Sequence, residues 1–164
     1  MFSLKLHNTL GNIKEEFIPI NKKHIKIYAC GPTVYNYAHI GNARMAVVCD
    51  LLVRILKTLY PKVTYVSNIT DIDDKIINAS NDTGKSIKEI TKKFESIYNE
   101  DMASLYVQSP DIQPRATEYI SDMINLVKQL IENDCAYEAE NHILFHVPSY
   151  KSYGALSGRN REDQ

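Results

Sequence analysis

The sequence predicts an α/β fold built on a parallel sheet. Residues 24–29 are rich in β-branched and aromatic side chains and run into the breaker Gly31-Pro32, which is typical of a buried strand that ends in a loop. Apolar residues then recur at helical spacing over residues 42–60, and Pro61 stops that helix. Residues 62–67 follow as a second strand, which completes a βαβ unit. Such units are right-handed in nearly every known case. We therefore expect a Rossmann-like arrangement.

The flanking segments complete the predicted fold. Residues 2–7 and 13–20 are extended segments separated by turn residues at 8–12, which favours a hairpin. After the βαβ unit, the patterns predict helices over residues 71–80, 86–105 and 115–133, and short strands over residues 136–138 and 143–147.

Size and composition indicate one compact unit with a hydrophobic core. The chain has 164 residues, 44% hydrophobic and 24% charged, with a formal net charge of -1, so it lacks the basic balance of a general nucleic-acid binder. No apolar run approaches the roughly 20 residues of a membrane span. The first residues lack the apolar core and cleavage site of a signal peptide. We expect a cytoplasmic protein without membrane contact.

The three cysteines differ in their surroundings. Their odd number and unequal spacing argue against a disulfide framework and for reduced thiols. Cys49 lies in an apolar run and is predicted to be a small buried hydrophobe, while Cys135 is predicted at a turn or strand entry. Cys30 ends a predicted strand, at the edge where open α/β sheets bind their ligands. It is therefore a candidate ligand.

The loop between the first strand of the βαβ unit and its helix holds the polar residues best placed for chemistry. Amides at a helix start lack intrahelical partners and lie at the positive end of the helix dipole, which favours phosphate. Gly41 lets a ligand approach the backbone closely, His39 can donate to phosphate oxygens, and Asn42 adds a neutral donor. A structural histidine beside a turn glycine is the alternative for this short pattern alone.

Three stretches carry a resemblance to a known family. Residues 30–35 (CGPTVY) and 39–44 (HIGNAR) form the first, residues 63–77 (VTYVSNITDIDDKII) the second, and residues 153–159 (YGALSGR) the third. Together they resemble the signatures of cysteinyl-tRNA synthetases, and the resemblance covers essentially the whole chain. It implies a class I synthetase catalytic domain, with a Rossmann-like nucleotide- and cysteine-binding half over residues 1–100. Residues 101–164 would be the start of a connective insertion, apparently truncated.

The resemblance also implies a reaction and its residues. A full-length enzyme of this family activates cysteine with ATP and magnesium to cysteinyl adenylate and transfers it to tRNA(Cys), and we expect a monomer. His39 and Asn42 would be the catalytic groups that hold the ATP phosphates beside Gly41, stabilising charge in the transition state. Cys30 would ligate one zinc ion per subunit, which selects the thiolate of cysteine over the hydroxyl of serine. The residues implied in the cysteinyl adenylate pocket are Gly31, Thr33, Asn68 and Thr70.

Several residues also have structural interpretations. Thr70 followed by Asp73 is close to a capping box, with further acidic residues in the first turn of a helix over residues 71–80. Arg44 either contacts phosphate or projects from its helix. His142 and His146 share a face of a predicted strand, and ordinary surface histidines explain them better than a metal pair.

The chain also departs from the family pattern. Asn42 stands where class I synthetases generally carry the second histidine of their signature, and Met45 stands where a threonine is common. The Lys-Met-Ser-Lys-Ser loop and the later zinc ligands do not occur. We therefore expect a fragment or truncated product of a longer enzyme, inactive by itself. Three alternatives remain open, namely a cysteine ligase acting on an amino sugar, a class I nucleotidyltransferase, and a noncatalytic truncated binding module.

Overall fold

A computed structural model describes residues 3–158 of the chain. It contains two compact units. One is formed by residues up to Pro19 together with those from Ser121 on, and the other by Ile20–Ile120. The second unit contains the predicted βαβ unit, and each unit is described here by itself.

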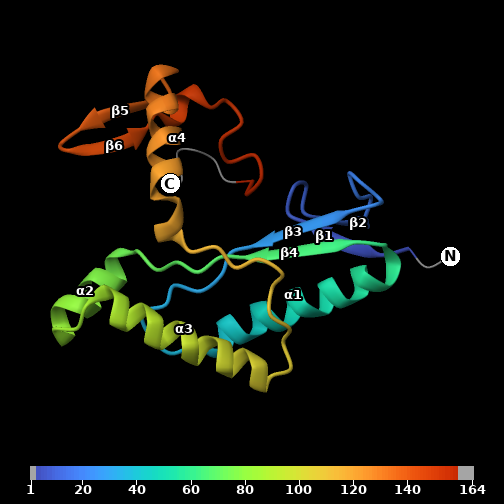
Figure 1. Ribbon diagram of the computed structural model, residues 1–164. Coiled ribbons are helices and arrows are strands. Elements are labelled where there is room, and N and C mark those ends of the chain that lie inside the picture. Colours follow the sequence, from blue (N-terminus) through green and yellow to red (C-terminus); the bar gives the residue numbers. More distant parts are fainter. Residues whose placement is uncertain (1–2, 159–164) are drawn as a thin grey trace. The chain divides into compact units, whose positions relative to one another are not determined.

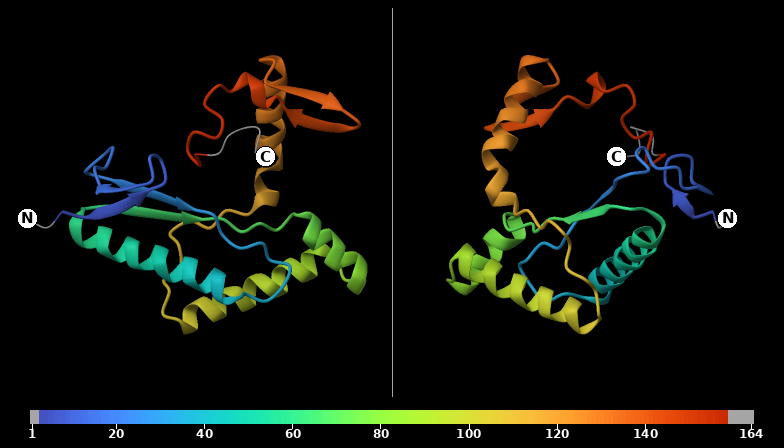
Figure 2. Two further views of the ribbon diagram at one scale, coloured as in Figure 1. Left: turned by 180° about the vertical axis from the view of Figure 1, so that it is seen from behind. Right: turned by 45° about the vertical axis from the view of Figure 1, so that its right-hand side comes forward.

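The centre of the second unit is a pair of parallel strands, β3 (Ile25–Ala29) and β4 (Val63–Ser67), joined by helix α1 (Ile40–Leu59). Figures 1 and 2 show α1 running along one face of this strand pair. The α/β class and the parallel pairing are thus confirmed, although α1 begins two residues before the predicted position 42.

Helix α1 packs against α3 (Ile87–Ser104). Ala46 of α1 forms a buried apolar cluster with Tyr98 and Met102 of α3. Helix α3 starts at a capping box in which Ser86 and Glu89 satisfy each other's backbone amides, close to the predicted start. The α1–α3 contact fixes the position of the loop that leads into α1, because Ala38 and Ala43 pack on the same cluster.

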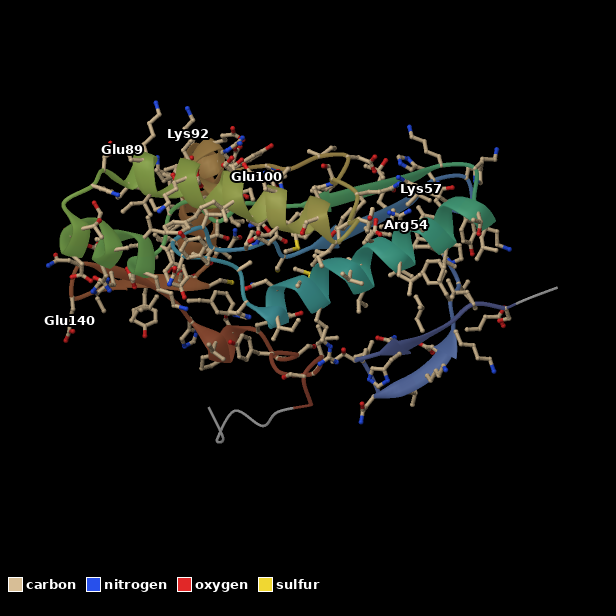
Figure 3. All side chains as sticks on the ribbon, turned by 90° about the horizontal axis from the view of Figure 1, so that it is seen from below. Arg54, Lys57, Glu89, Lys92, Glu100 and Glu140 are labelled. Atoms are coloured by element: carbon tan, nitrogen blue, oxygen red, sulfur yellow. The ribbon has the colours of Figure 1, made fainter. Side chains whose placement is uncertain are left out.

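A buried carboxylate ties α1 to the turn after α3. Asp50 accepts hydrogen bonds from Nε of Arg54 at 2.7 Å and from the amide of Gln108 at 3.1 Å. The guanidinium of Arg54, labelled on α1 in Figure 3, also donates to the carbonyl of Tyr106 at 2.8 Å. Because Asp50 is paired and hydrogen-bonded, its burial is compatible with a stable core.

Helix α2 (Asp74–Thr83) starts later than predicted. The amide of Ile69 donates to the carbonyl of Pro114 and that of Thr70 to the carbonyl of Pro32, so the chain stays extended through these residues. Asp73 is the N-cap of the helix, and its carboxylate accepts from the amide of Lys75 at 2.9 Å. The predicted capping box between Thr70 and Asp73 is therefore wrong, because Thr70 is held by strand-like pairing.

The next helix also starts later than predicted, because of similar strand-like pairing. Ile112 and Arg115 form isolated parallel bridges with Val66 and Ile69, so residue 115 is extended and not helical as predicted. A short 3₁₀ helix, η1 (Ala116–Tyr119), follows and leads into α4 (Ile120–Glu132). Backbone hydrogen bonds to β4 and its extension therefore delay the helix.

The first unit contains two antiparallel hairpins. Strands β1 (Lys5–Asn8) and β2 (Ile13–Glu16) form the hairpin predicted near the N-terminus. Strands β5 (Ala136–Ala139) and β6 (His142–Phe145) form the other, with Glu140 and Asn141 at positive φ in the turn, and η2 (Val147–Ser149) follows. Within residues 3–158, no helix is both long and apolar enough to cross a membrane.

Candidate functional site

The segments that follow β3 and β4 continue to pair beyond the strands. The amide of Thr70 donates to the carbonyl of Pro32 at 3.0 Å, and the amide of Val34 donates to the carbonyl of Thr70 at 3.2 Å. Thr33 and Thr70, two residues predicted to line one pocket, are consequently bridged to each other. The structure thus brings them together at the carboxyl edge of the strand pair, where α/β sheets bind ligands.

Gly31 approaches the backbone of Asn68 too closely for any side chain. A Cβ atom added at Gly31 would lie 1.6 Å from the carbonyl oxygen of Asn68. The amide of Gly31 donates to Oδ1 of Asn68 at 2.9 Å, and Nδ2 of Asn68 contacts Oγ1 of Thr70 at 3.2 Å. The Asn68 side chain therefore fixes the shape of the loop, and its predicted contact with an adenylate stays a prediction.

His39 and Asn42 form a reciprocal cap at the start of α1. Nδ1 of His39 accepts from the amide of Gly41 at 3.0 Å, and Oδ1 of Asn42 accepts from the amide of His39 at 3.1 Å. Because Nδ1 of His39 accepts a hydrogen bond, the neutral imidazole carries its proton on Nε2. The cap uses only the oxygen of the Asn42 amide, so the two N–H groups of Nδ2 remain as donors. No group within residues 3–158 hydrogen-bonds to Nε2 of His39 or Nδ2 of Asn42. Both side chains combine a capping acceptor with an available donor.

His39 and Asn42 both line a cavity of about 170 Å³. Its walls are loop residues 32–39, with Asn42 of α1, Lys75 of α2, and Phe94 and Tyr98 of α3. Pockets that enclose whole small-molecule ligands usually measure roughly 300–1,000 Å³. This cavity therefore fits part of a ligand, such as a phosphate chain. Of the predicted site residues it gathers Thr33, His39 and Asn42, whereas Cys30, Gly31, Gly41, Asn68 and Thr70 do not line it.

Aromatic rings and one lysine, Lys75, line this cavity, and Lys93 lies over two of those rings outside the wall. Nζ of Lys75 lies 5.5 Å from the ring centroid of Tyr35. The rings of Tyr37 and Phe94 meet edge to face at 5.3 Å, and Nζ of Lys93 lies 4.9 Å from the Phe94 centroid. No Asp or Glu lines the cavity, and Lys75 is the one Lys or Arg in its wall among the described residues. The cavity is therefore suited to an anion.

Cys30 follows β3 directly and is exposed, as expected for a ligand at that edge. Within residues 3–158, however, no group of three or more His, Cys, Asp or Glu side chains is placed to hold a metal ion. A zinc site needs at least three protein ligands. Cys30 supplies one, so these residues do not form a zinc site by themselves. His142 lies in β6 and His146 beyond its end, and neither belongs to such a group.

The acidic residues after β4 have structural partners. Asp71 is buried and accepts from the amide of Thr117 at 3.0 Å and from its hydroxyl at 2.6 Å. Asp73 caps α2. Arg44 projects from α1 as an exposed side chain. Asp73 thus has the structural role of a helix cap, whereas Asp71 lies before α2 and not in its first turn as predicted, and is held by Thr117 instead.

A larger hollow of about 650 Å³ lies beside α3, near Asp71 and Thr117. Two carboxylates, Asp71 and Glu95, line it, and the guanidinium of Arg115 is paired with Glu95, whereas Lys88 and Lys92 form no ion pair among residues 3–158. Lys92, labelled on α3 in Figure 3, is exposed. The smaller cavity, with unpaired donors and no acid, is the better candidate site.

Sequence reasoning did not single out Lys75 or Tyr35. Both lie inside the quoted motifs, but they are 40 positions apart, and their proximity depends on how α2 packs. No local pattern signals it.

The geometry defines a class of protein: an α/β domain with a cavity suited to an anion at the carboxyl edge of a parallel strand pair, beside the start of a long helix. Comparison with known proteins then gives the family. Residues 16–164 match the family model described as the class I (C) tRNA synthetase catalytic domain, and the chain belongs to this family.

Individual relatives agree with this assignment. The chain is 52% identical to a cysteine–tRNA ligase of Rhodospirillum rubrum over 161 residues, covering 98% of this chain and 35% of that protein. It is 54% identical to one of Saccharophagus degradans over 161 residues, with the same coverage. A third, from Wolbachia pipientis, is 52% identical over 160 residues, covering 98% of this chain and 34% of that protein. The chain thus spans about a third of the length of these relatives. Arg159, the last residue of the third matched stretch, lies outside the described residues.

Proposed function

We propose that this chain forms the part of a cysteine–tRNA ligase that binds ATP and cysteine for adenylate formation. The observation that carries the proposal concerns His39 and Asn42, which line one cavity in a member of this family. Among residues 3–158, no group hydrogen-bonds to Nε2 of His39 or Nδ2 of Asn42, and no carboxylate lines that cavity. The relatives' shared name supports cysteine as the amino acid and tRNA(Cys) as the acceptor.

The proposed reaction needs no nucleophile from the protein. A carboxylate oxygen of cysteine attacks the α-phosphorus of ATP, the bond to the bridging oxygen of pyrophosphate breaks, and cysteinyl adenylate and pyrophosphate result. Negative charge shifts onto the phosphate oxygens as this happens. His39 and Asn42 donate to those oxygens, and the cap holds both side chains in place beforehand, so that little reorganisation accompanies the reaction.

The residues of the loop edge would hold the cysteinyl moiety. Gly31, Thr33 and Thr70 lie together because the segments after β3 and β4 are paired, and Asn68 holds that pairing. Gly41 would give the phosphates access to the first amides of α1. Magnesium would accompany ATP as part of the substrate.

Cys30 is proposed as one zinc ligand at the same edge. A zinc ion bound there would supply preference for a thiolate over a hydroxyl. The other ligands would have to come from polypeptide beyond residues 3–158, and no step of the proposed reaction depends on the metal. Residues from about 101 onward are proposed to belong to an insertion that handles the acceptor end of tRNA(Cys).

The test is cysteine-dependent exchange of pyrophosphate into ATP. We would join this chain to the part of the Rhodospirillum rubrum relative that follows the matched segment, and call the product the joined enzyme. We expect exchange with cysteine and much less with serine, and no exchange by the 164-residue chain alone. A joined enzyme that folds and binds tRNA but gives no exchange with cysteine would contradict the proposal.

A further inference from the structure

Lys75 is placed to act on whatever occupies the cavity. It is the second residue of α2, where the Asp73 carboxylate fixes its backbone amide at 2.9 Å. Its side chain reaches the cavity wall, with Nζ 5.5 Å from the centroid of the Tyr35 ring. Two elements, the loop after β3 and the start of α2, therefore converge on one ammonium group.

Among residues 3–158, no acidic side chain neutralises the charge of Lys75. No ion pair involving its Nζ forms among residues 3–158, and no carboxylate lines the cavity. An aromatic face attracts a cation and restricts its position, but it does not cancel the charge. The ammonium group is thus pre-positioned over Tyr35 and still available to an anion.

We propose that Lys75 binds the phosphate chain of the nucleotide, as the cationic group of a site whose neutral donors are His39 and Asn42. This inference rests on the proposed function, since it takes the cavity as the phosphate site. A lysine ammonium binds phosphate as a compact point charge with three donors, and so it suits a chain of several phosphates better than a single planar group. Lys75 would contribute affinity and orientation that two neutral donors cannot supply.

Lys93 provides a matched control. It is also a lysine over aromatic rings, 5.7 Å from the Tyr37 centroid and 4.9 Å from the Phe94 centroid, but it does not line the cavity. Lys93→Gln and Lys75→Gln remove the same charge from neighbouring helices. A difference between them therefore reports on position, and not on the net charge of the protein.

The experiment is calorimetric titration of the 164-residue chain with two probes, ATP with magnesium and inorganic triphosphate. We expect Lys75→Gln to raise the Kd for both probes about tenfold, as for the loss of one charge-assisted hydrogen bond. Lys75→Arg should stay within about threefold of the wild type, and Lys93→Gln within about twofold. Thermal unfolding of each variant checks that the fold is intact.

The outcomes separate this inference from the proposed function. Equal affinities of Lys75→Gln and Lys93→Gln for both probes would overturn the role of Lys75, while ATP binding by the wild type would still support the proposed function. Triphosphate binding that depends on Lys75, without any ATP binding, would support the anion site and contradict its assignment to a nucleotide. A wild type that binds neither probe would overturn the inference.

Discussion

Nδ1 of His39 accepts a hydrogen bond from the amide of Gly41 at 3.0 Å, so the imidazole that caps α1 also directs its proton to Nε2. One side chain thus has two separable roles: capping by Nδ1 stabilises the helix, and donation by Nε2 serves the proposed chemistry. The sequence suggested either a phosphate donor or a structural histidine, and the structure shows an exposed capping residue whose Nε2 has no hydrogen-bond partner within residues 3–158.

The first prediction tests the capping role of His39, apart from its proposed donor role, by measuring the stability of two substitutions. His39→Ala removes the capping acceptor and should lower the free energy of unfolding by about 1 kcal/mol. His39→Ser supplies a hydroxyl acceptor that is favourable at an N-cap, and it should unfold at nearly the wild-type temperature. Thermal unfolding of the three proteins measures this. Equal destabilisation by both substitutions would argue against the capping role.

The second prediction concerns two glycines in the same loop and helix start. Gly31→Ala should cost at least about 3 kcal/mol or prevent folding, because its Cβ would overlap the backbone oxygen of Asn68 at 1.6 Å. In Gly41→Ala the new Cβ meets only the end of the His39 ring, at 2.8 Å, and that ring can turn. Gly41→Ala should therefore still fold, with a displaced imidazole, and lose no more than the roughly 1 kcal/mol that the His39 cap contributes. Urea unfolding of both variants tests the contrast, and similar stabilities would refute it.

The third prediction is a loss of stability at high pH. Burial raises the pKa of Tyr65 to about 12, with the nearby Cys49 as the second cause. Above pH 10 the folded state keeps the phenol proton of Tyr65, whereas the unfolded state loses it. The contribution of Tyr65 to the free energy of unfolding is therefore fully present below pH 10 and is lost as the pH rises to 12. The free energy of unfolding should fall by up to roughly 2 kcal/mol more across this range in the wild type than in Tyr65→Phe.

The control for that measurement is Tyr28→Phe, at a phenol that is 64% exposed. The change in pH dependence relative to the wild type should be larger in Tyr65→Phe than in Tyr28→Phe. Parallel curves for the wild type and Tyr65→Phe between pH 10 and 12 would show that Tyr65 is not the responsible group.

The fourth prediction concerns zinc. Because residues 3–158 offer Cys30 but no group of three ligands, the 164-residue chain should retain less than one zinc ion per molecule after dialysis. The joined enzyme should hold zinc, and Cys30→Ser should lower its zinc content and raise the KM for cysteine more than that for ATP. Elemental analysis gives the stoichiometry. An unchanged zinc content in Cys30→Ser would remove Cys30 as a ligand.

The βαβ unit could be predicted because its signals are local. The strand at residues 24–29, the breaker after it and the periodicity of α1 each lie within one segment. The starts of α2 and α4 could not be predicted, because Ile69, Thr70 and Arg115 are held extended by partners far away in the sequence. Tertiary pairing outweighed the local capping and helix signals there.

Part of the candidate site could also be predicted from the sequence. The resemblance identified Thr33, His39 and Asn42, and the structure places all three at one cavity. Its cation was not predictable, because Lys75 reaches Tyr35 only through the packing of α2. The cap at His39 was also missed, since histidine is not among the residues that normally mark an N-cap.

The most direct test of the account is single-turnover formation of cysteinyl adenylate by the joined enzyme, compared between the wild type and His39→Ser. This substitution keeps an acceptor for the cap and removes the Nε2 donor. We predict a rate at least about 10²-fold lower than that of the wild type, at an unchanged unfolding temperature, as for the loss of one donor to a transition-state oxyanion. A rate within a few-fold of the wild type in a folded His39→Ser enzyme would contradict the assignment of His39 as a phosphate donor.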